Sequence, residues 1–275
     1  MSVSLRCYST SLGCPKNRVD TERLLGSLGV ALVPVESPDE AELVFINTCA
    51  FIQPATEESV RTIAQAIADI EELPKRPLLA VAGCLVGRYH AEDLAPELPE
   101  VDLWLDNSDL EAWPAMLARK LGLPEPTVPG RILSTGPSYA WLKISDGCRH
   151  ACSFCAIPNI RGGHRSHCKD MIVREARALL DQGVNIAFDT IGKCNYQPDV
   201  SRADWLSRLC AEGYDTQIVM SMDITRRSNF ADRGGVGYSY LLDTFAPLAS
   251  EAGVPDRAWE NLLYRNALRI YKGQK

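Results

Sequence analysis

Three cysteines stand close together in the middle of the chain, in the segment Cys148-Arg-His-Ala-Cys152-Ser-Phe-Cys155. This C-x3-C-x2-C spacing lets three thiolates bind three irons of a four-iron cluster and leaves the fourth iron without a protein ligand. Such an open iron could hold the amino and carboxylate groups of S-adenosylmethionine, and electron transfer into the sulfonium would then cleave it to a carbon radical. Phe154, between the last two cysteines, could shield the cluster from water.

A zinc site is the alternative for the same three cysteines, completed by His150, His164 or His167, since Cys3His is a recognised zinc set. Structural zinc sites usually come as paired C-x2-C units, so the spacing favours iron and sulfur. Five basic residues surround the triplet and face the single acid Asp146; they are Lys143, Arg149, Arg161, Arg165 and Lys169. They either stabilise thiolates and a bound carboxylate or form a solvated basic loop.

Three further cysteines, Cys14, Cys49 and Cys84, are each 35 residues apart, and each follows a predicted strand. The carboxyl ends of parallel strands lie along one edge of a sheet, where ligands are bound. The sequence therefore predicts that these thiols converge on a second cluster site, again with an open iron, with Asn47 and Thr48 supplying nearby hydrogen bonds. Taken singly, each of them also fits a small buried hydrophobic residue.

The chain has ten cysteines, and in a reducing compartment metal binding or catalysis explains that number better than a disulfide framework does. Cys7 lies inside a predicted strand and Cys210 inside a predicted helix, so we expect both to serve packing. Cys168 and Cys194 have no partner that the sequence identifies.

Strands alternate with helices along the chain, which predicts a parallel sheet covered on both faces. Expected strands are 3–9, 43–48, 78–82, 139–144, 184–189 and 217–222, and expected helices are 17–28, 54–70, 169–180 and 202–211. Residues 121–138 hold four prolines and three glycines, a composition typical of a linker. We therefore divide the chain into an N-terminal domain (1–121), a linker (122–138) and a second domain (139–275).

The 275 residues are 46% hydrophobic and carry a formal net charge of −6, which argues against tight, nonspecific binding to nucleic acid. A local basic patch is still allowed. Residues 91–112 contain eight acids and neither Lys nor Arg, which indicates a solvated face or an acidic docking surface. No membrane span or secretory signal is expected, so the sequence predicts a cytoplasmic protein.

Four segments resemble the radical-SAM methylthiotransferase family over about residues 1–183. They are Ser11-Leu-Gly-Cys-Pro-Lys-Asn17, Ile46-Asn-Thr-Cys49, Ala82-Gly-Cys84 and Leu142-Lys-Ile-Ser-Asp-Gly-Cys148. The resemblance implies that Cys14, Cys49 and Cys84 hold an auxiliary four-iron cluster involved in sulfur delivery. It also implies that Cys148, Cys152 and Cys155 hold the cluster that cleaves S-adenosylmethionine.

The implied reaction is abstraction of a hydrogen from an unactivated carbon by a deoxyadenosyl radical, followed by insertion of a methylthio group. A second S-adenosylmethionine supplies the methyl, and an electron donor is needed. The match is closest to the branch of the family that modifies an aspartate of a small-subunit ribosomal protein. Relatives that modify a tRNA adenosine are the alternative, which the negative net charge disfavours, and a non-catalytic iron-sulfur or zinc-binding chimera is another.

From about residue 184 the chain instead resembles the last strands and loops of phosphotriesterase-like amidohydrolases, in residues 188–193, 217–223, 234–238 and 261–270. The implied fold is α/β, with an N-terminal parallel-sheet domain of the methylthiotransferase type followed by a partial TIM-like radical-SAM barrel. In a hydrolase Asp223 would ligate a metal. All four histidines precede residue 170, no His-x-His pair exists and Val236 stands at the family's loop histidine, so we expect Asp223 to be structural.

Overall fold

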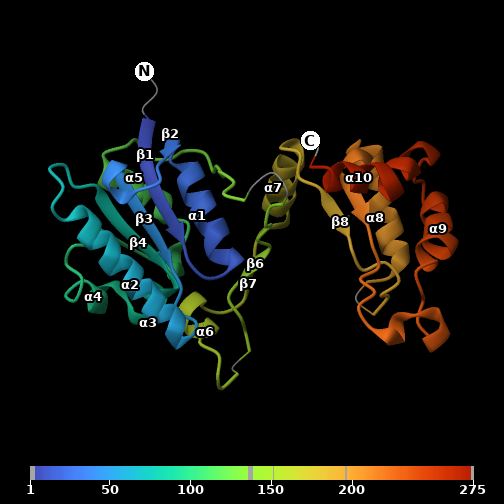
Figure 1. The fold of residues 1–275 in the computed structure, drawn as a ribbon, viewed down its shortest axis with the longest axis horizontal. Helices are drawn as coiled ribbons and strands as arrows, with labels where there is room; N and C mark the ends of the chain where they lie inside the picture. Colours follow the sequence, from blue (N-terminus) through green and yellow to red (C-terminus); the bar gives the residue numbers. More distant parts are fainter. Residues whose placement is uncertain (1–3, 136–138, 151, 196, 274–275) are drawn as a thin grey trace. The chain divides into compact units, whose positions relative to one another are not determined.

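The computed structural model describes residues 4–135, 139–150, 152–195 and 197–273 (Figure 1). The chain divides into two compact units, of which the first comprises Met1–Ser134 with Trp141–Ile172 and the second comprises Thr135–Ala140 with Val173–Lys275. Both cysteine triplets therefore belong to the first unit. The predicted division into domains at 122–138 stays a prediction.

The first unit is built on a five-stranded sheet, all of whose neighbouring strands pair in parallel. The strand order is β2 (Ala31–Pro34), β1 (Ser4–Ser11), β3 (Leu43–Thr48), β4 (Leu78–Gly83), β5 (Leu103–Asp106). Every residue of β3 is buried and β4 is nearly so, because central parallel strands are covered on both faces. The apolar runs of β3 and β4, which show no alternation of apolar and polar residues, therefore form strands.

Helices cover both faces of this sheet. On one face, α2 (Gln53–Ile70) and α3 (Cys84–Tyr89) pack Ile63 and Leu85 against Val44 and Val81. On the other, α1 (Pro15–Ser27) and α5 (Trp113–Leu121) supply a core that includes Leu24 and Trp113. The remaining elements of this unit are α4 (Ala91–Leu94), β6 (Ser145–Asp146), α6 (Ile157–Arg161), β7 (Arg165–Ser166) and the 3-10 turns Pro38–Glu40 and Asn107–Asp109.

The second unit contains two short parallel strands, β8 (Ile186–Phe188) and β9 (Ile218–Met220), with helix α8 (Asp199–Ala211) between them in the chain. Helix α7 (Lys169–Asp181) leads into it. Its core joins Leu206, Phe245 and Leu262. Helix α9 (Ala246–Glu251) continues a π-helical turn at Leu241–Phe245, and α10 (Asn266–Tyr271) continues another at Asn261–Arg265. The 3-10 turns of this unit are Tyr214–Gln217, Arg227–Asn229, Ala231–Arg233 and Asp256–Ala258.

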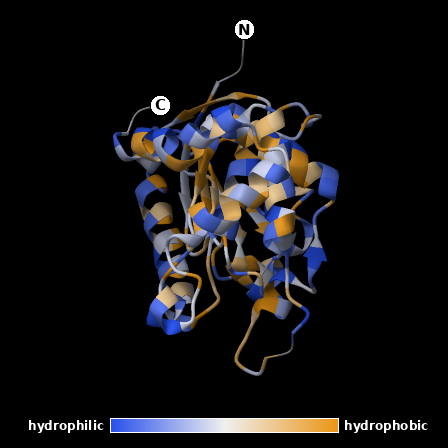
Figure 2. Cartoon of the chain, turned by 90° about the vertical axis from the view of Figure 1, so that its right-hand side faces the viewer, coloured by the Kyte–Doolittle hydropathy of each residue, from blue (hydrophilic) through white to orange (hydrophobic). Residues whose placement is uncertain are grey.

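The α/β class and the N-terminal parallel sheet are confirmed. The strands after this sheet are few and short, and the described residues form no closed barrel. Hydrophobic and hydrophilic residues alternate in bands along the helices, as expected for helices that each bury one side (Figure 2). In the parts of the chain that the structure describes, we find no helix with the length and apolar character needed to cross a membrane.

Residues 139–144 were expected to form a strand, and this prediction is wrong. Only Ser145–Asp146 pairs, in an antiparallel bridge to Arg165–Ser166. Trp141, Leu142 and Ile144 are exposed, whereas Lys143 between them is buried in ion pairs. The ion pairs draw Lys143 inward, so the alternation of buried and exposed side chains in this segment does not indicate a face of a sheet.

Candidate cluster sites at two cysteine triplets

The first three cysteines lie where neighbouring strands end. Cys14 caps the start of α1 three residues after β1, Cys49 directly follows β3, and Cys84 directly follows β4 as the first residue of α3. A Cβ added to Gly13 would stand 2.7 Å from both Cβ and Sγ of Cys49. The glycine, at φ +83°, therefore lets the loop that carries Cys14 pass directly over Cys49.

The three thiols are close enough to influence one another electrostatically. Burial raises the pKa of the Cys84 thiol above its ordinary value, and the neighbouring Cys49 and Cys14 add to this rise. The guanidinium of Arg161 acts in the opposite direction by charge and by a hydrogen bond. The structure thus brings together the three residues that sequence reasoning grouped, and it adds a cation beside them.

Asn17, buried at the start of α1, connects the loops that carry these cysteines. Its Nδ2 donates to the carbonyl of Thr48 at 2.7 Å and to that of Leu12 at 2.9 Å. Its Oδ1 lies 3.6 Å from the sulfur of Cys84 and accepts from Arg161 at 2.5 Å. One amide therefore spaces the ends of β1, β3 and β4 relative to one another.

Asn47 and Thr48 make hydrogen bonds at this edge, as expected, and these bonds go to the protein frame. Asn47 Nδ2 donates to the Asn17 carbonyl at 2.9 Å, and Thr48 Oγ1 donates to the Ala82 carbonyl and accepts from the Leu85 amide at 3.2 Å. Another amide, Nδ2 of Asn107 just after β5, lies 3.8 Å from the Cys84 sulfur.

A buried network of four charges lies next to this edge. Lys143 Nζ is 2.6 Å from both Asp20 and Asp146. Arg161 reaches Asp20 at 3.2 Å and Asp146 at 2.9 Å. Lys143 is 5% exposed and Arg161 3%, so these two residues are not part of a solvated basic loop. Arg149, Arg165 and Lys169 are exposed.

The network pairs two cations with two carboxylates. Burial alone would raise the pKa of Asp146, but Arg161, Lys143 and the Gly147 amide together hold it at about 2. Burial also opposes the charged form of Arg161, yet Asp20, Cys84 and Asp146 raise its pKa further. The network fastens the segment that carries the second cysteine triplet to helix α1.

The second triplet lies on the loop between β6 and α6. Cys152 is exposed, and Cys148 and Cys155 are partly exposed. The Cys155 amide donates to the Cys152 carbonyl at 3.0 Å, and the Cys148 amide donates to the Gly162 carbonyl at 3.2 Å. The Phe154 ring, expected to shield this site, is 87% exposed.

Within residues 4–135, 139–150, 152–195 and 197–273, no three Cys, His, Asp or Glu side chains are arranged closely enough to hold a metal ion. The chemistry of the donors nevertheless fits iron-sulfur clusters. Each triplet offers three thiols without a disulfide, and one of these thiols, Cys84, has a buried cation beside it that would offset the charge of a thiolate. The role of both triplets as ligands stays a prediction.

The other cysteines allow a test of which thiols are ligands. Burial raises the pKa of Cys7 to about 12 and that of Cys210 to about 11, so brief alkylation of the metal-free protein near neutral pH should leave both unmodified. The exposed thiols should react: Cys14, Cys152, Cys168 and Cys194. After anaerobic loading with iron and sulfide, peptide mass spectrometry should find Cys14 and Cys152 protected and the other two still reactive. Equal labelling of Cys14 and Cys168 after loading would contradict the assignment.

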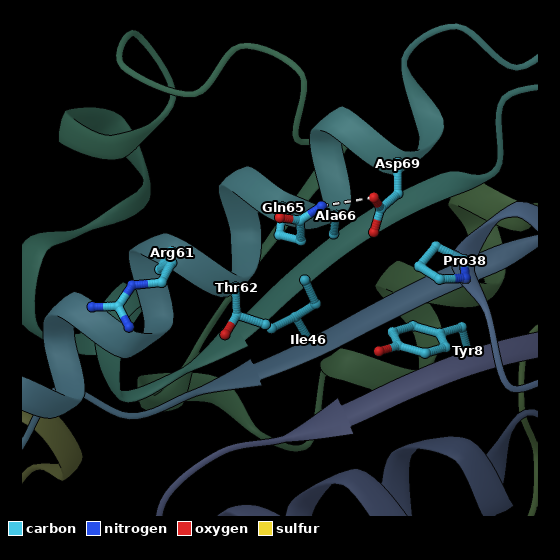
Figure 3. A pocket seen from close by; sticks show the side chains of 8 residues that line it. All are labelled: Tyr8, Pro38, Ile46, Arg61, Thr62, Gln65, Ala66 and Asp69. Atoms are coloured by element: carbon cyan, nitrogen blue, oxygen red, sulfur yellow. Dashed lines mark hydrogen bonds between the residues drawn. The ribbon is translucent and has the colours of Figure 1, made fainter.

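Among the clefts formed by the described residues, two lie in the first unit. One, of about 280 Å³, lies between α2 and the strands β1 and β3, where Figure 3 shows Arg61 and Asp69 on the helix and Tyr8 on the strand. None of the residues that line it is a cysteine or histidine. The other, of about 400 Å³, is next to the cysteine edge and is lined by residues that include His90, Asp106, Arg161 and Arg165.

Asp223, the hydrolase candidate, follows β9 in a left-handed conformation at φ +46°. Its carboxylate pairs with Lys193. A lysine that pairs with the carboxylate offsets its negative charge, and the structural role expected from the sequence stays a prediction.

Comparisons with known proteins divide the chain in two. Residues 6–106 match the family described as Uncharacterized protein family UPF0004, and residues 162–271 match the Phosphotriesterase family. The second match begins before residue 184, where the sequence motifs placed the change.

The N-terminal part is similar to proteins named Ribosomal protein uS12 methylthiotransferase RimO. That of Nitratidesulfovibrio vulgaris strain DP4 is 71% identical over 177 residues, which cover 64% of this chain and 41% of the relative. That of Lawsonia intracellularis is 57% identical over 184 residues, 66% of this chain and 42% of the relative. The chain thus spans about two fifths of the length of these relatives.

Among solved structures, the phosphotriesterase homology protein of Escherichia coli is 17% identical and covers 98% of each chain, with a TM-score of 0.35. A similarity at this level decides nothing about the fold.

Proposed function

We propose that this chain, whose first part resembles the RimO-type radical-SAM methylthiotransferases and whose last part resembles the phosphotriesterase family, is a RimO-like methylthiotransferase. Its substrate would be an aspartate of ribosomal protein uS12. The observation that carries the proposal is that two sets of three cysteines belong to one compact unit, with one set at the carboxyl edge of its parallel sheet.

Cys14, Cys49 and Cys84 would hold one four-iron cluster, and Cys148, Cys152 and Cys155 the other. When bound, the clusters and S-adenosylmethionine supply radical formation and the sulfur and methyl of the new group. The chain's own residues would bind the clusters and orient them. Cys49 and Cys84 are buried and would bind the inner side of their cluster, whereas Cys14 is exposed and would bind its outer side.

The charged network has a positioning role in this proposal. Asp20 on α1 binds Lys143 on one side of Cys148 and Arg161 on the other side of Cys155. Both ends of the loop that carries the second triplet are thereby fixed to α1, the helix that begins directly after Cys14. These ion pairs would thus hold the two cysteine triplets at a fixed position relative to each other within the first unit.

The partners follow from the proposed chemistry. They are the ribosomal protein substrate and an electron donor, with the cytoplasm as the compartment. Nucleic acid is not favoured as the substrate, because the chain carries a formal net charge of −6.

The test is the product. The reconstituted chain is incubated anaerobically with uS12, S-adenosylmethionine, sulfide and a strong reductant, and the uS12 peptides are analysed by mass spectrometry. We expect one aspartate to carry a methylthio group in place of a hydrogen and deoxyadenosine to accumulate. The same product on a tRNA adenosine, and not on uS12, would show the substrate to be wrong.

A second candidate is a non-catalytic metal-binding chain. It is favoured by one observation, that the described residues form no closed barrel. In a radical-SAM barrel the middle strands would hold the adenosine and methionine portions of the cofactor. Bound clusters without any deoxyadenosine formation would support this candidate.

A further inference from the structure

Arg161 belongs to the segment of the second cysteine triplet, yet its side chain ends beside the first. Helix α6, which ends at Arg161, packs on α3, which begins at Cys84. A Cβ on Gly87 would stand 2.6 Å from the Ile160 carbonyl oxygen, so the two helices approach backbone to backbone. Only a glycine at position 87 allows this approach, which brings the arginine to the cysteine edge.

The guanidinium and the sulfur of Cys84 share a neighbour. Oδ1 of Asn17 accepts from Arg161 Nη2 at 2.5 Å and lies 3.6 Å from the Cys84 sulfur. The positive charge of Arg161 therefore lies close to the sulfur, and it lowers the pKa of the Cys84 thiol against the effect of burial. Both residues are nearly inaccessible to water, at 3% and 4% exposure. Little water therefore reaches the guanidinium or the sulfur while the arginine is in place.

A metal-bound sulfur is a thiolate and has no proton to give to Asn17. The Asn107 amide, whose Nδ2 is 3.8 Å away, can then donate to the sulfur, and the Arg161 guanidinium, bound to Asn17 Oδ1, places a positive charge beside it. Hydrogen bonds from such outer partners orient ligands, and their loss typically lowers metal affinity by about 10- to 100-fold. In iron-sulfur proteins, hydrogen bonds to sulfur and local charge also set the reduction potential.

This position requires the several N–H donors that an arginine guanidinium holds in a fixed plane. One guanidinium reaches Asp20, Asp146 and Asn17 from different nitrogens. A lysine ammonium is a single point with three donors on a flexible stem and cannot reproduce that geometry. Lys143 already serves as the second cation for the same two carboxylates, so Arg161 can also bind Asn17 Oδ1, which lies 3.6 Å from the sulfur.

We propose that Arg161 is a positioning residue for the Cys14, Cys49 and Cys84 site, where its guanidinium orients the Cys84 sulfur and determines how firmly iron is retained. This inference rests on the proposed function, because it requires that the site holds a cluster. It also links the two triplets, since the residue that supports one site lies on the segment that carries the other.

The test uses the full chain with Cys148, Cys152 and Cys155 replaced by alanine, so that only the first site is loaded. In this parent, Arg161→Met should make a chelator remove iron about tenfold faster and should shift the reduction potential to more negative values, because a cation beside the cluster favours its reduced form. Arg161→Lys should give intermediate values for both. Arg165→Met is the matched control, an exposed cation of the same segment, and should change neither.

Removing a buried cation leaves two carboxylates with one partner, so a second variant keeps the charges balanced. Arg161→Met combined with Asp20→Asn leaves Lys143 paired with Asp146, and circular dichroism shows whether the fold is kept. A folded double variant that retains iron at the parent's rate and potential would overturn the inference alone. A parent that takes up no iron would overturn the proposed function together with it.

Discussion

Replacing Cys148, Cys152 and Cys155 by alanine should lower the iron of the anaerobically reconstituted chain from about eight to about four per chain. The Cys14, Cys49 and Cys84 triple variant should also retain about four. The reason is that each triplet lies on its own structural frame, the first on the ends of β1, β3 and β4 and the second on the loop between β6 and α6. Iron and acid-labile sulfide are measured on the same samples.

The control for this experiment is the Cys168→Ala and Cys194→Ala double variant, which removes two exposed thiols outside both triplets and should keep about eight irons. If either triple variant lost all of its iron, the triplets would not be independent sites. Zinc in place of iron in anaerobically purified protein would favour the zinc-binding alternative.

The second large effect concerns the stability of the first unit. Asp20→Ala should lower its free energy of unfolding by about 3–5 kcal/mol, because it removes one partner of a buried ion-pair network and leaves two cations against Asp146. Urea dependence of hydrogen exchange at the amides of β3 and β4 reports this unit by itself. The metal-free protein is used, so that cluster loss does not contribute.

Lys75→Ala is the matched control for this prediction. Lys75 pairs with Glu42 at 3.6 Å in the same unit, but its side chain is 84% exposed. Exposed pairs contribute at most about 1 kcal/mol, so the variant should be close to the unchanged protein. An Asp20→Ala effect as small as that of Lys75→Ala would mean that the network does not fasten the 143–161 segment to α1.

The central strands and long helices of the first unit could be predicted because their patterns are local. The apolar runs at 43–48 and 78–82 have the length and composition of buried strands, and helix α2 has a clear amphipathic period. The grouping of Cys14, Cys49 and Cys84 followed from a rule about parallel sheets, which needs the order of elements and not their contacts. Strand β5 was missed because four residues inside an acidic stretch give too little signal.

The charged network could not have been predicted from the sequence. Asp20 and Arg161 are 141 residues apart, and nothing local to either residue indicates the other. The basic residues of the 143–169 segment look alike in the sequence, yet two are buried in ion pairs and three are exposed. In the sequence Asn17 is one residue of a motif, and its role in spacing the strand ends appears only when β1, β3 and β4 lie side by side.

The proposed chemistry requires that Cys148, Cys152 and Cys155 hold a cluster with one iron open to S-adenosylmethionine. Electron paramagnetic resonance of the Cys14, Cys49 and Cys84 triple alanine variant, reduced and loaded with iron, examines this requirement without interference from the other site. We expect a four-iron cluster signal that changes when S-adenosylmethionine is added at saturating concentration. A signal that is identical with and without S-adenosylmethionine would refute the open iron and the radical chemistry that depends on it.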